Sequence, residues 1–247
     1  MERQFFIFFI ISIFLFVDCA YSSVIEVDVS KALKVDISSF SYDCVMNIVE
    51  FNVESYNTGT IGYKSRTSID IFNENGIVFK GWGKENTLMP GGRENSEIYW
   101  YTNSTGNFTV RVRIYYGNEI MEKNFSIEKN VSSDSENVFE IRNFRTYDDF
   151  VVFDVIPKND VENVVFIPSN FPLGWIFEQT KIDSIRDGNT KTVSIIYKPS
   201  VWYERDIYLE IASDNGKYYT GEFFKLKKET GIKRLLHSII DRIKLSI

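Results

Sequence analysis

The chain has 247 residues, a formal net charge of −6, one histidine and two cysteines. A single histidine excludes a metal site built from several histidines, and two cysteines exclude a framework of disulfides. From Lys225 onward seven basic residues stand against two acidic ones, so the rest of the chain is strongly acidic. An acidic body argues against nucleic acid as a partner, because that binding needs a basic face on the folded domain.

Residues 1–22 have the pattern of a signal peptide. Arg3 precedes a run of 13 residues, 5–17, that is apolar except for one serine. Ala20 and Ser22 are the small residues that a signal peptidase needs for cleavage after position 22. The run is short for crossing about 30 Å of hydrocarbon as a helix, which favours cleavage over the alternative of a retained anchor. We therefore expect an exported protein.

Period-two alternation of apolar and polar residues dominates the rest of the chain, with turn residues between the runs. The clearest runs cover residues 48–54, 108–114, 193–197 and 207–211. Such runs, spaced this closely, are typical of antiparallel β-sandwiches. The sequence predicts an all-β fold with two tandem Ig-like antiparallel β-sandwiches, over residues 23–128 and 137–228, joined by a polar linker over residues 129–136.

Four Asn-x-Ser/Thr sequons cluster in the first predicted sandwich and at its end. Behind a signal peptide, such clustering predicts surface glycosylation wherever the source cell glycosylates its exported proteins. The candidate acceptors are Asn103, Asn107, Asn124 and Asn130.

Residues 229–247 follow a different period. Their apolar residues recur at steps of three and four, which predicts an amphipathic helix with basic flanks. Three roles stay open for this helix: docking on its own sandwich, lying on a membrane surface, or pairing with a partner helix. The apolar face consists of Ile232, Leu235, Leu236, Ile239, Ile240 and Ile243.

The residues that usually carry catalysis are sparse. Cys19 leaves with the signal peptide unless it is lipidated, a weaker alternative because Asp18 precedes it. Cys44 is then alone, and we expect it to be a small buried residue on a strand. His237 falls on the polar face of the predicted helix, a poor place for a catalytic base. We expect no enzymatic activity, no cofactor and no metal site.

Aromatic residues make up 16% of the chain. Most should lie in the cores, because each buries a large apolar area. Trp202 and Tyr203 follow Pro199 in a predicted loop, which makes them the best exposed candidates for stacking against a ligand such as a sugar.

Two sets of turn residues carry a family resemblance. Residues 53–60, with their Asn-Thr-Gly turn, followed by 69–72 and by the Pro-Gly-Gly of 88–92, resemble the Ig-like cell-adhesion-related domain of bacterial and archaeal surface proteins. Phe-Pro-Leu-Gly-Trp at 171–175 and the turn Asp187-Gly188 resemble the Ig-like module associated with α-galactosidases and archaeal S-layer-type proteins. Lys198-Pro199 also fits that second pattern.

The resemblance implies spacer or adhesion modules without catalytic residues. We therefore expect a secreted or cell-surface protein that acts as a structural spacer or adhesion module of a prokaryotic envelope, most consistent with an archaeal one. Its partners would be other envelope proteins or surface glycans, with peripheral membrane contact through the terminal helix. The alternative is a carbohydrate-binding protein that uses the exposed aromatic side chains.

Overall fold

A computed structural model describes residues 32–227 and Leu245, and all of these belong to one compact unit. The predicted signal peptide, the predicted helix of 229–247 except Leu245, and His237 lie outside the described residues. Residues 32–227 form fifteen β-strands and one short 3-10 turn, η1 (Asp214–Gly216). Every pairing between neighbouring strands of a sheet is antiparallel, and the strands make four sheets, which confirms the all-β prediction.

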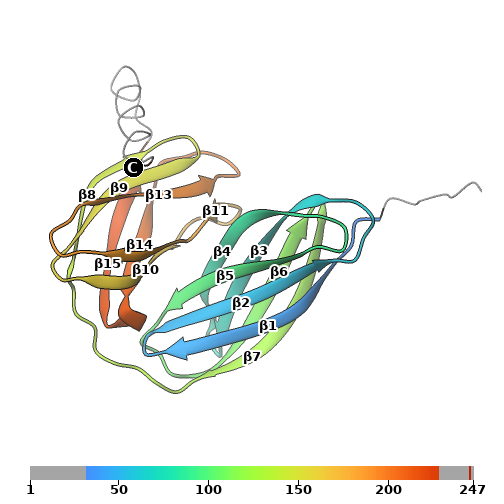
Figure 1. Ribbon diagram of the computed structural model, residues 1–247, viewed down its shortest axis with the longest axis horizontal. Coiled ribbons are helices and arrows are strands. Elements are labelled where there is room, and N and C mark those ends of the chain that lie inside the picture. Colours follow the sequence, from blue (N-terminus) through green and yellow to red (C-terminus); the bar gives the residue numbers. More distant parts are fainter. Residues whose placement is uncertain (1–31, 228–244, 246–247) are drawn as a thin grey trace, which may run out of the picture. The chain divides into compact units, whose positions relative to one another are not determined.

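The first seven strands build two sheets that enclose the first core, in the blue to green half of the ribbon in Figure 1. One sheet has the order β1-β2-β5 and the other has the order β4-β3-β6-β7. The strands are β1 (Val35–Val45), β2 (Ile48–Asn57), β3 (Tyr63–Asn73), β4 (Gly76–Leu88), β5 (Arg93–Tyr101), β6 (Gly106–Tyr116) and β7 (Glu119–Lys129).

The remaining strands build the second pair of sheets, in yellow to red in Figure 1. Their orders are β12-β10-β14-β15 and β11-β13-β9-β8. The strands are β8 (Phe139–Thr146), β9 (Phe150–Pro157), β10 (Val161–Ser169), β11 (Ile176–Phe177), β12 (Thr180–Ile185), β13 (Lys191–Lys198), β14 (Arg205–Ser213) and β15 (Tyr218–Leu226).

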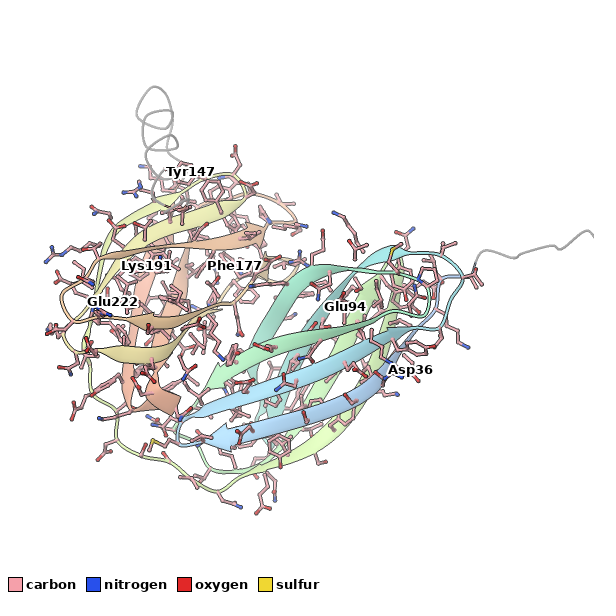
Figure 2. All side chains as sticks on the ribbon, viewed as in Figure 1. Asp36, Glu94, Tyr147, Phe177, Lys191 and Glu222 are labelled. Carbon is pink, nitrogen blue, oxygen red and sulfur yellow. The ribbon has the colours of Figure 1, made fainter. Side chains whose placement is uncertain are left out.

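Alternation places one face of each strand in a core. On β6, Phe108, Val110, Val112 and Ile114 are all buried, as the period-two pattern of 108–114 requires. The second core is rich in aromatic side chains; among them Phe177, labelled in Figure 2, is buried, whereas Glu222 on β15 is exposed. Each sandwich therefore has a core of its own, which is what a domain of this size needs for stability.

Strand β3 departs from this rule, because both of its faces are covered. Thr67, Ile69 and Ile71 face the core, while Arg66 and Asp70 lie on the outer face and are still buried. Something must therefore cover the outer face of this sheet, and the candidate site lies there.

Candidate functional site

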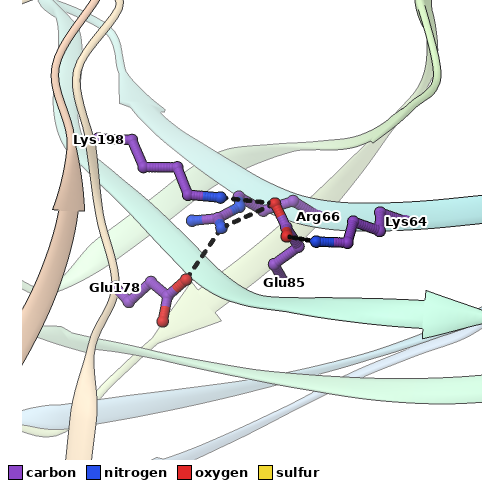
Figure 3. A network of polar contacts seen from close by, with 5 residues as sticks. All are labelled: Lys64, Arg66, Glu85, Glu178 and Lys198. Atoms are coloured by element: carbon purple, nitrogen blue, oxygen red, sulfur yellow. Dashed lines mark hydrogen bonds and ion pairs between the residues drawn. The ribbon is translucent and has the colours of Figure 1, made fainter. Parts of the chain in front are cut away.

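An ion-pair network joins the first sandwich to the second at the outer face of β3 (Figure 3). Arg66 Nη2 lies 2.9 Å from Glu178 Oε1 and 3.3 Å from Glu85 Oε2. Glu85 also accepts from Lys198 Nζ at 2.8 Å and from Lys64 Nζ at 3.0 Å. Hydrogen bonds from Lys198 and then Lys64 lower the pKa of Glu85 to about 2. Glu85 is therefore an ionised centre shared by three cations.

The Arg66–Glu178 pair is buried, whereas the lysines are not. The side chains of Arg66 and Glu178 are 5% and 10% exposed, against 49% for Lys198 and 74% for Lys64. A charge removed from water needs its partner, because an unpaired buried charge is costly. The buried pair is consequently the part of the network that fixes the contact between the sandwiches.

Beside this pair, the side chain of Gln179 completes the backbone hydrogen bonding of Tyr99 on β5. The Tyr99 N–H donates to Gln179 Oε1 at 2.6 Å, and Gln179 Nε2 donates to the Tyr99 carbonyl at 2.7 Å. Both residues are buried. An amide side chain here takes the place of a neighbouring strand, and it comes from the other sandwich.

Asn47, in the turn between β1 and β2, holds a second point of contact. It is fully buried, and its Nδ2 donates to the Ser133 carbonyl at 2.7 Å and to Ser135 Oγ at 2.9 Å. Its backbone N–H donates to the Asn215 carbonyl at 3.3 Å. Gly216 has φ +93°, and a Cβ there would lie 2.8 Å from Asn47 Cβ, so glycine permits this close approach.

An aromatic pair lies between these polar contacts. The rings of Tyr101 on β5 and Tyr219 on β15 are stacked at 3.8 Å between centroids, with an interplanar angle of 10°. The Tyr219 hydroxyl donates to Glu210 Oε1 at 3.2 Å. Glu210 lines a cavity of about 610 Å³ together with Tyr101, and burial raises the pKa of its carboxyl to about 7.

The contact between the sandwiches also has an apolar part. Three residues of β10 and β14 pack with the core of the first sandwich rather than with their own: Val165, Ile167 and Ala212. Apolar contact supplies stabilisation in proportion to the area removed from water, and the polar groups fix its geometry.

A second cavity, of about 560 Å³, opens on the outer face of the sheet that contains β3. Arg66, Lys80, Trp82 and Tyr115 line it from the first sandwich, and Ile176 lines it from the second. The rings of Trp82 and Tyr115 are 5.1 Å apart with an interplanar angle of 43°. The cavity thus combines aromatic walls with cationic side chains, the mixture usual in small-molecule sites.

The structure places the predicted site residues as follows. Trp202 is half-buried, with its ring stacked 5.6 Å from that of Trp175, and Tyr203 is 43% exposed and packs edge-on against the same Trp175. Cys44 is half-buried on β1, free of a disulfide, and burial raises the pKa of its thiol. The four predicted glycosylation sites are all exposed: Asn103, Asn107, Asn124 and Asn130.

Within residues 32–227 no group of His, Cys, Asp and Glu side chains is arranged to hold a metal ion. The described part of the chain also contains no helix long and apolar enough to cross a membrane.

Sequence reasoning missed the contacts between the sandwiches. Arg66 lies far along the chain from the adjacent residues Glu178 and Gln179, and no local pattern links it to them. The one signal in the sequence was that Arg66, Ser68 and Asp70 stand at alternate positions of one strand. The apolar Ile69 and Ile71 flank the last of them.

No protein-family model matches the chain, and no curated protein matches it. Among solved structures, the chain is similar to a transglutaminase of red sea bream, with 10% identity over 81% of this chain and 32% of that chain, and a TM-score of 0.30. An alpha-2-macroglobulin of Salmonella gives 9% identity over 81% of this chain and 16% of that chain, with a TM-score of 0.31.

The dimeric latent PorU of Porphyromonas gingivalis gives 12% identity over 83% of this chain and 21% of that chain, with a TM-score of 0.31. This chain spans a third or less of the length of each of the three. Likeness at this level carries no argument about activity, so a functional proposal has to come from the residues themselves.

Proposed function

We propose that this protein is a non-enzymatic, exported structural module of a cell surface, in which two Ig-like sandwiches act as one rigid spacer or adhesion unit. The observation that carries the proposal is the buried contact between the sandwiches, above all the Arg66–Glu178 ion pair and the double hydrogen bond between Gln179 and Tyr99. Domains joined only by a linker move relative to one another unless their interface is large and apolar or otherwise fixed. Buried polar groups that pair across a contact fix its orientation, as Gln179 and Tyr99 do here.

A rigid pair suits a spacer, because it holds whatever it displays at a set distance from its attachment point. The resemblance of the two sandwiches to cell-adhesion-related and S-layer-type modules, and the signal-peptide pattern of residues 1–22, support the same assignment. The partners would be other envelope proteins or surface glycans. The envelope would be that of a prokaryote, most consistent with an archaeon.

The test is accessibility on intact source cells. Protease added outside the cells should digest the protein while a cytoplasmic marker stays whole, and fractionation should recover the protein with the envelope or the medium. Digestion only after lysis would overturn the proposal. Calorimetry of the full chain adds a check on rigidity, since residues 32–227 should unfold in one transition if the two sandwiches act as a unit.

A further inference from the structure

The outer face of the sheet β4-β3-β6-β7 gathers buried polar atoms that have no hydrogen-bond partner. Eight buried side-chain atoms in the described residues lack a partner, and five of them lie on this face. They are Arg66 Nη1, Ser68 Oγ, Asp70 Oδ1, Trp82 Nε1 and Arg111 Nε. An unpaired buried polar group is costly, so a cluster of them on one face calls for an explanation.

Strand register makes these side chains one continuous patch. Between β3 and β6, Arg66 pairs with Tyr115, and Asp70 pairs with Arg111. Between β3 and β4, Ser68 pairs with Trp82. Residues in register on adjacent strands present their side chains to the same face. We name this patch the outer-face cluster, and it consists of Arg66, Ser68, Asp70, Lys80, Trp82, Arg111, Arg113 and Tyr115.

Three cations of the outer-face cluster surround Asp70, but they leave one of its carboxylate oxygens without a hydrogen bond. Arg113 Nη1 and Arg111 Nη2 reach Asp70 Oδ2 at 2.8 Å and 3.4 Å. Lys80 Nζ stays 3.9 Å from Asp70 Oδ1, too far for a hydrogen bond. One carboxylate oxygen is therefore an open acceptor beside open donors.

The unpaired donors and acceptors of the cluster indicate the chemistry of a ligand that would fit it. Arg66, Trp82 and Arg111 offer donors, Asp70 offers an acceptor, and the Ser68 hydroxyl serves as either. A simple anion would satisfy the donors alone, and an apolar molecule would satisfy none of the five. A ligand rich in hydroxyl groups suits such a mixed set, because each hydroxyl both donates and accepts, and Arg66 and Trp82 of this set line the adjoining cavity. The electron-rich faces of Trp82 and Tyr115 suit the apolar C–H face of a sugar ring.

We propose that the outer-face cluster and the adjoining cavity of about 560 Å³ form a saccharide-binding site. Arg66 Nη1 and Trp82 Nε1 are covered, so the sugar reaches them when the ends of Lys80 and Glu85 shift. These two side chains line the cavity and are 27% and 29% exposed. The site is distinct from the Trp202–Tyr203 loop, and failure of saccharide binding would leave the spacer proposal standing.

The test is NMR titration of the full ¹⁵N-labelled chain with cellohexaose, mannohexaose and a hyaluronan hexasaccharide. Trp82→Phe identifies the Trp82 indole N–H signal by its loss. We expect at least one of these sugars to shift that signal, and Asp70→Asn and Tyr115→Ala each to raise its Kd at least tenfold. Preference for hyaluronan over the two neutral sugars would show that the basic side chains select a uronic acid.

Tyr203→Ala is the matched control, because it removes an exposed aromatic ring outside the cluster. If Asp70→Asn does not fold, Tyr115→Ala alone decides, since the Tyr115 side chain is only partly buried. The proposal fails if none of the three sugars shifts the Trp82 signal. It also fails if the folded cluster variants bind as tightly as the unaltered chain, or if Tyr203→Ala weakens binding as much as they do.

Discussion

The side-chain amide of Gln179 forms two hydrogen bonds with the backbone of Tyr99, one to its N–H at 2.6 Å and one to its carbonyl at 2.7 Å. The two residues belong to different sandwiches and both are buried. A side chain of the second sandwich thereby satisfies two buried main-chain groups of β5. This relationship makes the stability of the first sandwich depend on the presence of the second.

Gln179→Met tests that dependence. Methionine keeps the length of the side chain and removes both hydrogen bonds, so the Tyr99 N–H and carbonyl are left unpaired at about 1–3 kcal/mol each. We expect the free energy of unfolding, measured by urea denaturation, to fall accordingly. Asp183→Asn, on an exposed position of β12, the strand that follows Gln179, is the control and should change it by less than about 0.5 kcal/mol. Equal stability of the two variants would contradict the prediction.

The buried Glu178 and the exposed Lys198 of the ion-pair network should contribute unequally to the free energy of unfolding. Glu178→Ala leaves the buried Arg66 guanidinium short of a partner, and breaking a buried pair in this way costs about 3–5 kcal/mol. Lys198→Ala removes an ion pair whose members are 49% and 29% exposed, which should cost less than about 1 kcal/mol. Denaturation of both variants in the same buffer gives the comparison. A loss for Lys198→Ala as large as that for Glu178→Ala would refute this ranking.

Glu210 should make stability fall as pH rises through the neutral range. Burial raises the pKa of its carboxyl from 4.5 to about 7, so the folded state binds the proton more tightly than the unfolded state does. The stabilisation is complete below pH 4.5 and is lost as pH rises towards and past 7, in total about 3 kcal/mol. Glu85 acts in the opposite sense but only below its usual pKa, because its own pKa is lowered to about 2. Measurements between pH 5 and 8 therefore avoid the range in which Glu85 titrates.

Glu210→Gln keeps an acceptor for the Tyr219 hydroxyl and removes the titration. Its free energy of unfolding should lose most of the decline between pH 5 and 8 that the unaltered chain shows. Glu222→Gln, on an exposed position of β15, should keep the decline. Superimposable pH profiles for the unaltered chain and Glu210→Gln would show that another group is responsible.

Local pattern predicted the strands well, because one face of most strands meets a core and the other meets water. The run 108–114 became the central part of β6, with its alternate apolar residues buried. The turn residues also behaved as expected: Gly76 and Gly188 have φ values of +125° and +68°, which few residues other than glycine adopt readily.

Local pattern could not predict the contacts between the two sandwiches. On β3 both faces are buried, so the alternation that identifies a half-exposed strand carries no information about what covers Arg66 and Asp70. The half-burial of Trp202 likewise depends on its loop folding back over Trp175, a contact that spacing along the chain does not encode. Contacts of this kind depend on how the folded sheets pack against one another. The periodicity of a single sequence describes only which face of each strand is apolar.

Asn47→Ala should loosen the segment that joins the two sandwiches. Its side chain donates to the Ser133 carbonyl and to Ser135 Oγ, and its Oδ1 accepts from the Ser133 N–H at 3.0 Å. Alanine removes these bonds, and a longer one from Ser132 Oγ, from a fully buried position, at a cost of about 1–3 kcal/mol for each group left unpaired.

We expect the Asn47→Ala variant to be cut by a glutamate-specific protease at Glu136 at least several-fold faster than the unaltered chain, since cleavage follows local opening. Asn118→Ala, at an exposed turn between β6 and β7, is the matched control and should be cut at the unaltered rate. Mass spectrometry of the fragments locates the cut. Faster cleavage that is spread evenly over the chain would mean global destabilisation, and unchanged cleavage at Glu136 would mean that other contacts hold the segment in place.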